Sequence, residues 1–303
     1  MVEFKLPSGY NYCLSLSFVY PRPESTPELW NPDRKLFIFP VKDEVIVTHF
    51  KGNVAYIETN LSARKAISYV VSKLNIDSYG LKSMHKGLSI AKEIGLLNKY
   101  PHIDGFIPPK LGDSPNLLYS SLIKTIIMQM VSYTVARKMI SRFVRVFGKP
   151  LTYKGIIFYA FPEPEIAYEF SEKVIKEKAT VSMAKAKAIR EVAKLELENT
   201  LKDIEAKAWK NPHEAVRELM KIKGIGYWTA YVSLMAGLGI WHAQPIDRLI
   251  TNLNKAGIDC DKPVFEESPS TAGYISVAIL FGEEALRGRY FRVEKCEKTW
   301  INP

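Results

Sequence analysis

The segment between Leu219 and Asp247 limits the fold more than any other part of the chain. Two stretches with helix-period apolar residues, 212–222 and 227–236, are joined only by a short turn that contains Gly224-Ile225-Gly226. Glycine at the first and last of these positions permits a positive φ and a close approach of the backbone. The pattern predicts two helices packed as a hairpin, whose turn offers backbone N–H groups that can hold a phosphate. The Pro245-Ile246-Asp247 run that follows places a carboxylate at the start of the next helix.

The chain from residue 116 onward carries helix-period apolar residues almost throughout. The predicted helices span residues 117–131, 133–147, 163–176, 182–195, 201–209, 212–222, 227–236 and 245–256. Their connections are short, which predicts a compact helical bundle.

The first hundred residues have a different pattern. Apolar and β-branched residues run or alternate over 14–20, 35–40, 44–50 and 53–59, with turn signals between them, and these are the expected strands. Ser62 is a good N-cap for a helix that ends near Leu74, and Gly95 ends a second helix. We therefore expect an α+β fold with an antiparallel-sheet domain over 1–100, a proline-rich linker over 101–115 and a helical domain over 116–303.

Charge and cysteine content narrow the class of protein. Forty-two Lys and Arg against 32 Asp and Glu give a net charge of +10, which fits a polyanionic partner, although many basic proteins bind none. The three cysteines (Cys13, Cys260 and Cys296) are far apart and form no metal-ligand cluster. Few cysteines, no apolar run long enough to span a bilayer and no signal-peptide pattern near Met1 predict an intracellular protein without membrane contact.

Three segments together resemble the helix-hairpin-helix superfamily of DNA glycosylases, and within it the alkylation-repair branch of inducible 3-methyladenine DNA glycosylases. The first is the hairpin with the Trp228-Thr229-Ala230 run and Pro245-Ile246-Asp247. The second is Ile126–Ser132, followed by Ala136-Arg137-Lys138 and Phe147-Gly148. The third and weakest is Tyr10-Asn11-Tyr12 leading to Phe18. They cover most of residues 1–285, and the resemblance places the helix-hairpin-helix at about 212–237.

The resemblance implies a monofunctional glycosylase that flips an alkylated purine out of double-stranded DNA and hydrolyses its N-glycosidic bond in base excision repair. Asp247 matches the family's catalytic carboxylate. Because this bond breaks through an oxocarbenium-like sugar, a fixed carboxylate can stabilise the positive charge or orient a water. The alternative for Asp247 is a helix-start residue that interacts only with the helix dipole.

The implied base pocket consists of Trp228, Phe18 and Tyr231. Family members that also cut the strand carry a nucleophilic lysine at the hairpin position that Trp228 occupies here, so no lyase activity is expected. A tryptophan there offers an aromatic wall for a cationic methylated purine, and plain core packing is the alternative. Arg248, after the catalytic position, and the 271–274 run depart from the family pattern, which leaves the base specificity open.

The remaining implied roles concern DNA contact. Gln129 and Met130 match the pair that enters the duplex when a nucleotide is flipped, where an apolar wedge fills the vacated stack. A buried methionine at a helix end is the alternative. Contacts to the DNA backbone are expected from Gly224, Ile225, Gly226, Thr229 and Lys223. Some of the spaced basic residues on the helices are expected to contact phosphates and most to lie on solvated faces: Arg137, Lys138, Arg142, Arg145, Lys149, Lys185, Lys187 and Arg190.

The resemblance also suggests that the backbone carbonyls of Met220, Ile222 and Ile225 hold a monovalent cation. The four-cysteine set that binds an iron–sulfur cluster in some relatives is absent, and no other cofactor is expected. The expected protein is a monomer that acts on damaged double-stranded DNA, in the cytoplasm or nucleoid if prokaryotic. Two alternatives stay open: a helix-hairpin-helix glycosylase for an oxidised, deaminated or mismatched base, and a non-catalytic DNA-binding protein that keeps the hairpin.

Overall fold

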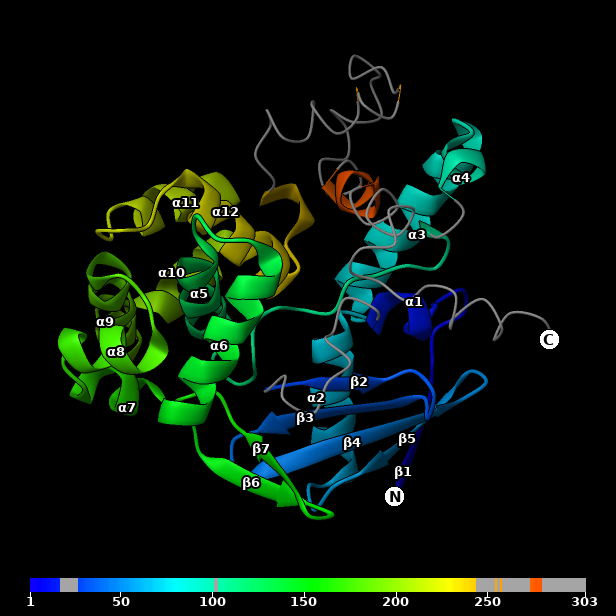
Figure 1. Cartoon of the computed structure of the whole chain (residues 1–303). Coiled ribbons are helices and arrows are strands. Elements are labelled where there is room, and N and C mark those ends of the chain that lie inside the picture. The colour runs from blue at the N-terminus through cyan, green and yellow to red at the C-terminus, as the bar shows by residue number, and fades with distance from the viewer. Residues whose placement is uncertain (17–26, 101–102, 244–253, 255–256, 258–272, 280–303) are drawn as a thin grey trace.

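The computed structural model describes residues 1–16, 27–100, 103–243, 254, 257 and 273–279. An antiparallel sheet with its own helices lies beside a bundle of helices that follows it in sequence (Figure 1). The α+β class expected from the sequence is confirmed.

The sheet has five antiparallel strands in the order β1-β5-β4-β3-β2. The strands are β1 (Val2–Lys5), β2 (Leu29–Asn31), β3 (Leu36–Val41), β4 (Glu44–Lys51) and β5 (Val54–Glu58). Three of the four strands predicted from period-2 patterns match β3, β4 and β5 closely. The tight turn between β4 and β5 depends on Gly52, whose φ of +58° suits glycine.

In the described part of the first hundred residues, the helices beside the sheet are α1 (Tyr12–Leu16), α2 (Ala63–Leu74), α3 (Ser78–Glu93) and α4 (Leu96–Lys99). The prediction of a strand beginning at Leu14 is wrong, because this part of the chain forms α1. The side chain of Asn11 accepts a hydrogen bond from the Leu14 N–H at 3.1 Å, which caps the helix, and the Ser15 hydroxyl donates to the Asn11 carbonyl at 2.7 Å. These local bonds outweigh the apolar pattern of the segment.

The bundle comprises α5 (Leu117–Met128), α6 (Tyr133–Phe147), α7 (Pro164–Glu169), α8 (Glu172–Ala179), α9 (Met183–Leu197), α10 (Thr200–Ala208), α11 (Pro212–Met220) and α12 (Tyr227–Val232). α12 continues as a π-helical turn, η2 (Ser233–Leu238), and a 3₁₀ turn, η3 (Trp241–Ala243), follows. The single helix expected over 163–176 is two, because Phe170 is extended and the Ser171 side chain caps α8 by accepting from the Val174 N–H.

A hairpin that was not predicted from the sequence, β6 (Pro150–Tyr153) and β7 (Ile156–Tyr159), interrupts the bundle and lies against the sheet (Figure 1). Phe158 from β7 packs with Leu29, Ile38 and Val47 in a small core of its own. The Tyr153 hydroxyl donates to Glu58 at 2.7 Å. The hairpin therefore ties the bundle to the outer face of the sheet.

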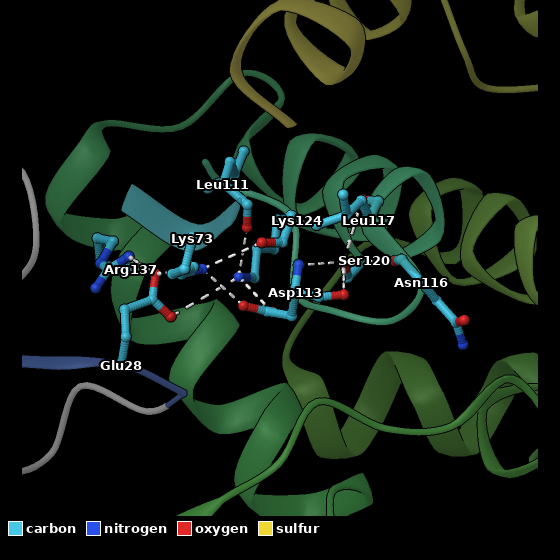
Figure 2. Close-up of polar contacts among 10 residues, drawn as sticks. Glu28, Lys73, Leu111, Asp113, Asn116, Leu117, Ser120, Lys124 and Arg137 are labelled. Atoms are coloured by element: carbon cyan, nitrogen blue, oxygen red, sulfur yellow. Dashed lines mark hydrogen bonds and ion pairs between the residues drawn. The ribbon is translucent and has the colours of Figure 1, made fainter. Parts of the chain in front are cut away.

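A buried cluster of five charged side chains joins the sheet domain and the helical bundle more tightly than the β6-β7 hairpin does (Figure 2). Asp113, in the segment between them, pairs with Lys73 of α2 at 2.8 Å and Lys124 of α5 at 2.6 Å. Glu28 lies 3.7–3.9 Å from Lys73, Lys124 and Arg137 of α6. The Lys124 side chain has no exposed surface and also donates to the Leu111 carbonyl at 2.7 Å. We call these five residues the ion cluster.

The ion cluster makes the protein sensitive to acid. Burial alone would raise the pKa of Glu28, but the positive charges of Lys124, Lys73 and Arg137 outweigh it and lower that pKa to about 2. A carboxylate whose pKa is lower in the folded protein stabilises it fully above the unfolded pKa, and that stabilisation disappears as the pH falls through the folded value. We expect the urea midpoint to fall steadily from about pH 4.5 towards pH 2. In Glu28→Gln the slope over this range should be shallower. Equal slopes would contradict the assigned role.

The chain returns to the sheet after the bundle. Trp241 and residues 274, 275, 278 and 279 are buried in the same core as α2, α3 and the sheet, and the Tyr274 hydroxyl donates to the Phe106 carbonyl at 2.6 Å. The domain boundaries at 100 and 115 stay a prediction. Among the described residues, no helix is long and apolar enough to cross a membrane.

Cys13 in α1 is disulfide-bonded. Cys260 and Cys296 lie outside the described residues. Disulfides are rare in reducing compartments, and intracellular proteins of hyperthermophiles are the main exception. The reducing compartment expected from the low cysteine count stays a prediction.

Candidate nucleic-acid interface

The predicted helix-hairpin-helix is present as α11, the turn of residues 221–226 and α12. Gly224 has a φ of +93°, and a Cβ there would lie 3.0 Å from the Ala188 Cβ of α9, so the turn needs glycine for two reasons. The Ile225 N–H donates to the Ile222 carbonyl at 3.0 Å and closes the turn. Ile222 and Ile225 are buried, so their side chains hold the turn against the interior of the protein.

The outer side of the turn is open. Lys223, Gly226, Tyr227 and Trp228 are all exposed, and a Cβ at Gly226 would meet nothing within 4 Å. Gly226 is the N-cap of α12, and no side chain caps this helix. The first N–H groups of a helix have no intrahelical acceptor. The start of α12 therefore presents donors to an anion that approaches Gly226.

The second predicted DNA contact lies directly beside this turn. α5 ends at Met128, and residues 129–132, which we call the wedge loop, lead into α6. Met130 has a φ of +55° and is 101% exposed, so it is not a buried helix-end methionine. The Ser132 side chain caps α6 by accepting from the Val135 N–H at 3.4 Å.

Four long-range hydrogen bonds fix the wedge loop and the end of α5 to their neighbours. The Gln129 side-chain amide donates to the Gly224 carbonyl at 2.9 Å and to the Thr229 hydroxyl at 2.8 Å. From the other side, Lys185 Nζ in the first turn of α9 donates to the carbonyls of Ile127 at 2.9 Å and Gln129 at 2.7 Å. Partial burial lowers the pKa of Lys185. The wedge loop, the hairpin turn and the start of α9 thus form one connected surface.

The predicted pocket and catalytic residues fall into three groups. Trp228 is 37% exposed at the start of α12, as a stacking surface requires. Tyr231 is buried between α11 and α12, where its hydroxyl lies 2.8 Å from His213 Nδ1 and its ring centroid 4.4 Å from that of Tyr227. Phe18 and Asp247 lie outside the described residues.

The structure limits which atoms of the hairpin can make the predicted contacts to a phosphate or a cation. Thr229 is 2% exposed and its hydroxyl accepts from Gln129, so a phosphate contact would have to use its backbone N–H. For the monovalent cation, the Ile222 carbonyl already accepts from Ile225, while each carbonyl oxygen has a second lone pair. The cation and its three carbonyls stay a prediction.

Most of the basic residues considered for phosphate contact bind other parts of the chain instead. Arg137 belongs to the ion cluster, Arg142 donates to the Thr180 hydroxyl at 2.6 Å and Arg190 pairs with Glu172 at 3.1 Å. The particular role of Lys185 was missed, because its partners lie about 57 residues away in the chain and nothing in the local sequence points to them. Lys138 and Lys187 remain exposed.

Solved DNA glycosylases have the same fold, with a sheet domain beside a helical bundle. A 3-methyladenine DNA glycosylase from Archaeoglobus fulgidus superposes with a TM-score of 0.74 at 23% identity, over 96% of this chain and all of that one. An 8-oxoguanine glycosylase/lyase from Clostridium acetobutylicum, solved with double-stranded DNA, has a TM-score of 0.67 at 21% identity, over 90% of this chain and 92% of that one.

At the level of sequence, the chain is similar to a Bacillus subtilis (strain 168) protein named "Putative DNA-3-methyladenine glycosylase YfjP". The two are 32% identical over 126 residues, which cover 40% of this chain and 40% of YfjP. No protein-family model matches the chain.

Proposed function

We propose that this protein is a monofunctional DNA glycosylase that removes alkylated purines from double-stranded DNA. The observation that supports it best is the adjacency of the two predicted DNA contacts. An exposed methionine on a positive φ lies one residue from a glutamine that is bonded to the twin-glycine turn. A glycosylase must hold the backbone and fill the vacated stack at the same lesion, so it needs these two elements side by side.

The proposed chemistry divides between two residues. Trp228 offers its exposed face to a flipped, cationic methylated base, which is attracted to the negative face of an indole. Asp247 is assigned the catalytic role from its match to the family motif. A base that already carries positive charge is a good leaving group, so its removal needs no strong general acid. The similarity to the Archaeoglobus and Bacillus proteins, both named as 3-methyladenine glycosylases, supports alkylated purines as the substrate class.

The absence of lyase activity is also part of the proposal, and Trp228 at the position of the lyase lysine supports it. Lys223 is exposed nearby but precedes the first glycine of the turn. The experiment is a set of duplexes, each with one defined lesion, scored for abasic sites and treated in parallel with borohydride. We expect abasic sites at alkylated purines and no covalent adduct. A trapped adduct would contradict the monofunctional assignment and favour the 8-oxoguanine type. Binding that ignores damage and leaves no abasic site would indicate a non-catalytic protein.

The two glycines of the turn should respond differently to the same change. Gly226→Ala adds a methyl group where the protein offers open space, so we expect a loss of stability below about 1 kcal/mol and a clear loss of DNA affinity. Gly224→Ala forces a positive φ on alanine and presses against Ala188, so we expect it to destabilise the fold by about 1–2 kcal/mol. Urea unfolding and fluorescence anisotropy with a labelled duplex separate the effects. Unchanged affinity in Gly226→Ala would place the phosphate elsewhere.

A further inference from the structure

The resemblance assigns Gln129 to the pair that enters the duplex, but its side chain is already committed. The two acceptors of its amide, the Gly224 carbonyl and the Thr229 hydroxyl, belong to the turn and to α12, respectively, 95 and 100 residues further along the chain. One amide nitrogen carries two hydrogens, so both bonds are satisfied at once. Thr229 is 2% exposed, and withdrawing Gln129 would remove the only donor that the described residues direct at its hydroxyl oxygen.

The backbone of Gln129 is held as firmly as its side chain. Lys185 donates to its carbonyl at 2.7 Å and to that of Ile127 at 2.9 Å, at the end of α5 where the last helical carbonyls need donors. A substitution at Gly224 would also press on α9, because the Ala188 Cβ lies 3.0 Å from the position of an added Cβ. The next residue, Met130, is fully exposed. Gln129 therefore connects the hairpin turn, to which it is bonded, with the exposed Met130 wedge.

We propose that Gln129 is a positioning residue that fixes the Met130 wedge to the hairpin turn, and that Met130 alone enters the duplex. This inference rests on the proposed function. We call the hydrogen bonds of Gln129 to Gly224 and Thr229 the latch. When the turn binds a phosphate, the latch fixes the position of the Met130 wedge relative to that phosphate. Once the protein has bound the DNA backbone, the wedge can insert without a separate ordering of the loop. Such preorganisation raises the rate of a step that needs its groups in a fixed geometry.

The deciding variant is Gln129→Met. Methionine has nearly the length and volume of glutamine and can fill a gap in the stack, but it donates no hydrogen bond. If Gln129 only filled the gap, this variant would keep its activity on duplex DNA. With the latch lost, we expect kcat on a paired lesion to fall about tenfold, the loss that goes with about one net hydrogen bond, while KM stays within about twofold because the hairpin still binds the backbone.

A second substrate separates a latch from a general structural effect. When the same lesion stands unpaired in a bulge, little unstacking is needed, so Gln129→Met should recover most of its kcat there. Met130→Ala should show the same pattern of loss and recovery, and combining the two changes should add little, because they act on one step. Equal losses of Gln129→Met on paired and bulged lesions would overturn the latch, as would full activity on the paired lesion.

Thr229 provides a second test of the same bond. Thr229→Val removes one acceptor at nearly constant volume and should reproduce part of the kcat loss, whereas Thr229→Ser keeps the hydroxyl and should lose less. Equal losses in the two would count against the latch. If Gln129→Met does not fold, this pair decides the question.

A measurement that does not depend on enzyme activity tests the latch independently of the proposed function. In the intact protein without DNA, the side-chain amide protons of Gln129 should exchange slowly with water and should exchange faster in Thr229→Val. Exchange at the rate of a free glutamine would overturn the latch. If the wild type releases no base from any lesion while these protons are protected, the proposed function fails and the latch stands as a structural feature of the DNA-binding surface.

Discussion

Lys124→Met is expected to lower the free energy of unfolding by about 3–5 kcal/mol, because it breaks a buried ion cluster by removing one partner. The Lys124 side chain is fully buried and lies 2.6 Å from Asp113. Methionine keeps the bulk but removes the nearest cation of the buried Asp113 carboxylate, which among the described residues then keeps only its pair with Lys73 at 2.8 Å. Urea unfolding at neutral pH measures the loss.

The matched control is Lys149→Met. Lys149 pairs with Asp43 at 2.5 Å, but these two side chains are 61% and 73% exposed, so water screens the pair and it contributes little to stability. A small loss in the control and a large loss at Lys124 would show that burial decides the effect. A loss below about 1 kcal/mol at Lys124 would mean that the ion cluster does not hold the two parts of the molecule together.

Asp247→Asn is expected to reduce base release by at least about 10²–10³-fold, on the scale of removing one electrostatic contact to a transition state, while DNA binding survives. The amide has nearly the same size but no charge with which to stabilise an oxocarbenium-like sugar. Single-turnover release from a duplex with one 7-methylguanine measures the effect, and anisotropy measures binding.

Asp203→Asn is the control for the alternative that Asp247 serves only its helix. Asp203 lies exposed in the first turn of α10, where a carboxylate interacts with the helix dipole. Its substitution should cost about 0.3–1 kcal/mol of stability and leave base release intact. If Asp247→Asn behaves like Asp203→Asn, the catalytic assignment is wrong.

Local patterns predicted the parts of this structure that depend on local interactions. The bounds of α6 follow from Ser132 as N-cap and a regular apolar period, and the expected Tyr133–Phe147 is found. The turn at Gly224 follows from the need for a positive φ. One error falls where a pattern had two solutions: the apolar run from Leu14 suits a strand or a buried helix, and the Asn11 side chain decides for the helix.

The contacts that assemble the site could not be predicted from sequence, because they join residues that no local pattern relates. Gln129 and Met130 were singled out together, yet one is bonded to the hairpin and the other is fully exposed. Lys124 lies in a helix that is buried almost all round, and its charge is tolerated only because Asp113 and Glu28 arrive from elsewhere in the chain.

Glycosylase activity on alkylated purines is tested most directly by release of free base from DNA methylated with a radiolabelled alkylating agent. Purified protein is incubated with this DNA, the polymer is precipitated and the soluble bases are separated by chromatography, with Asp247→Asn as the parallel sample. We expect labelled 3-methyladenine or 7-methylguanine in the soluble fraction with the wild type and almost none with the variant. Label that stays entirely in the polymer with the wild type would contradict it.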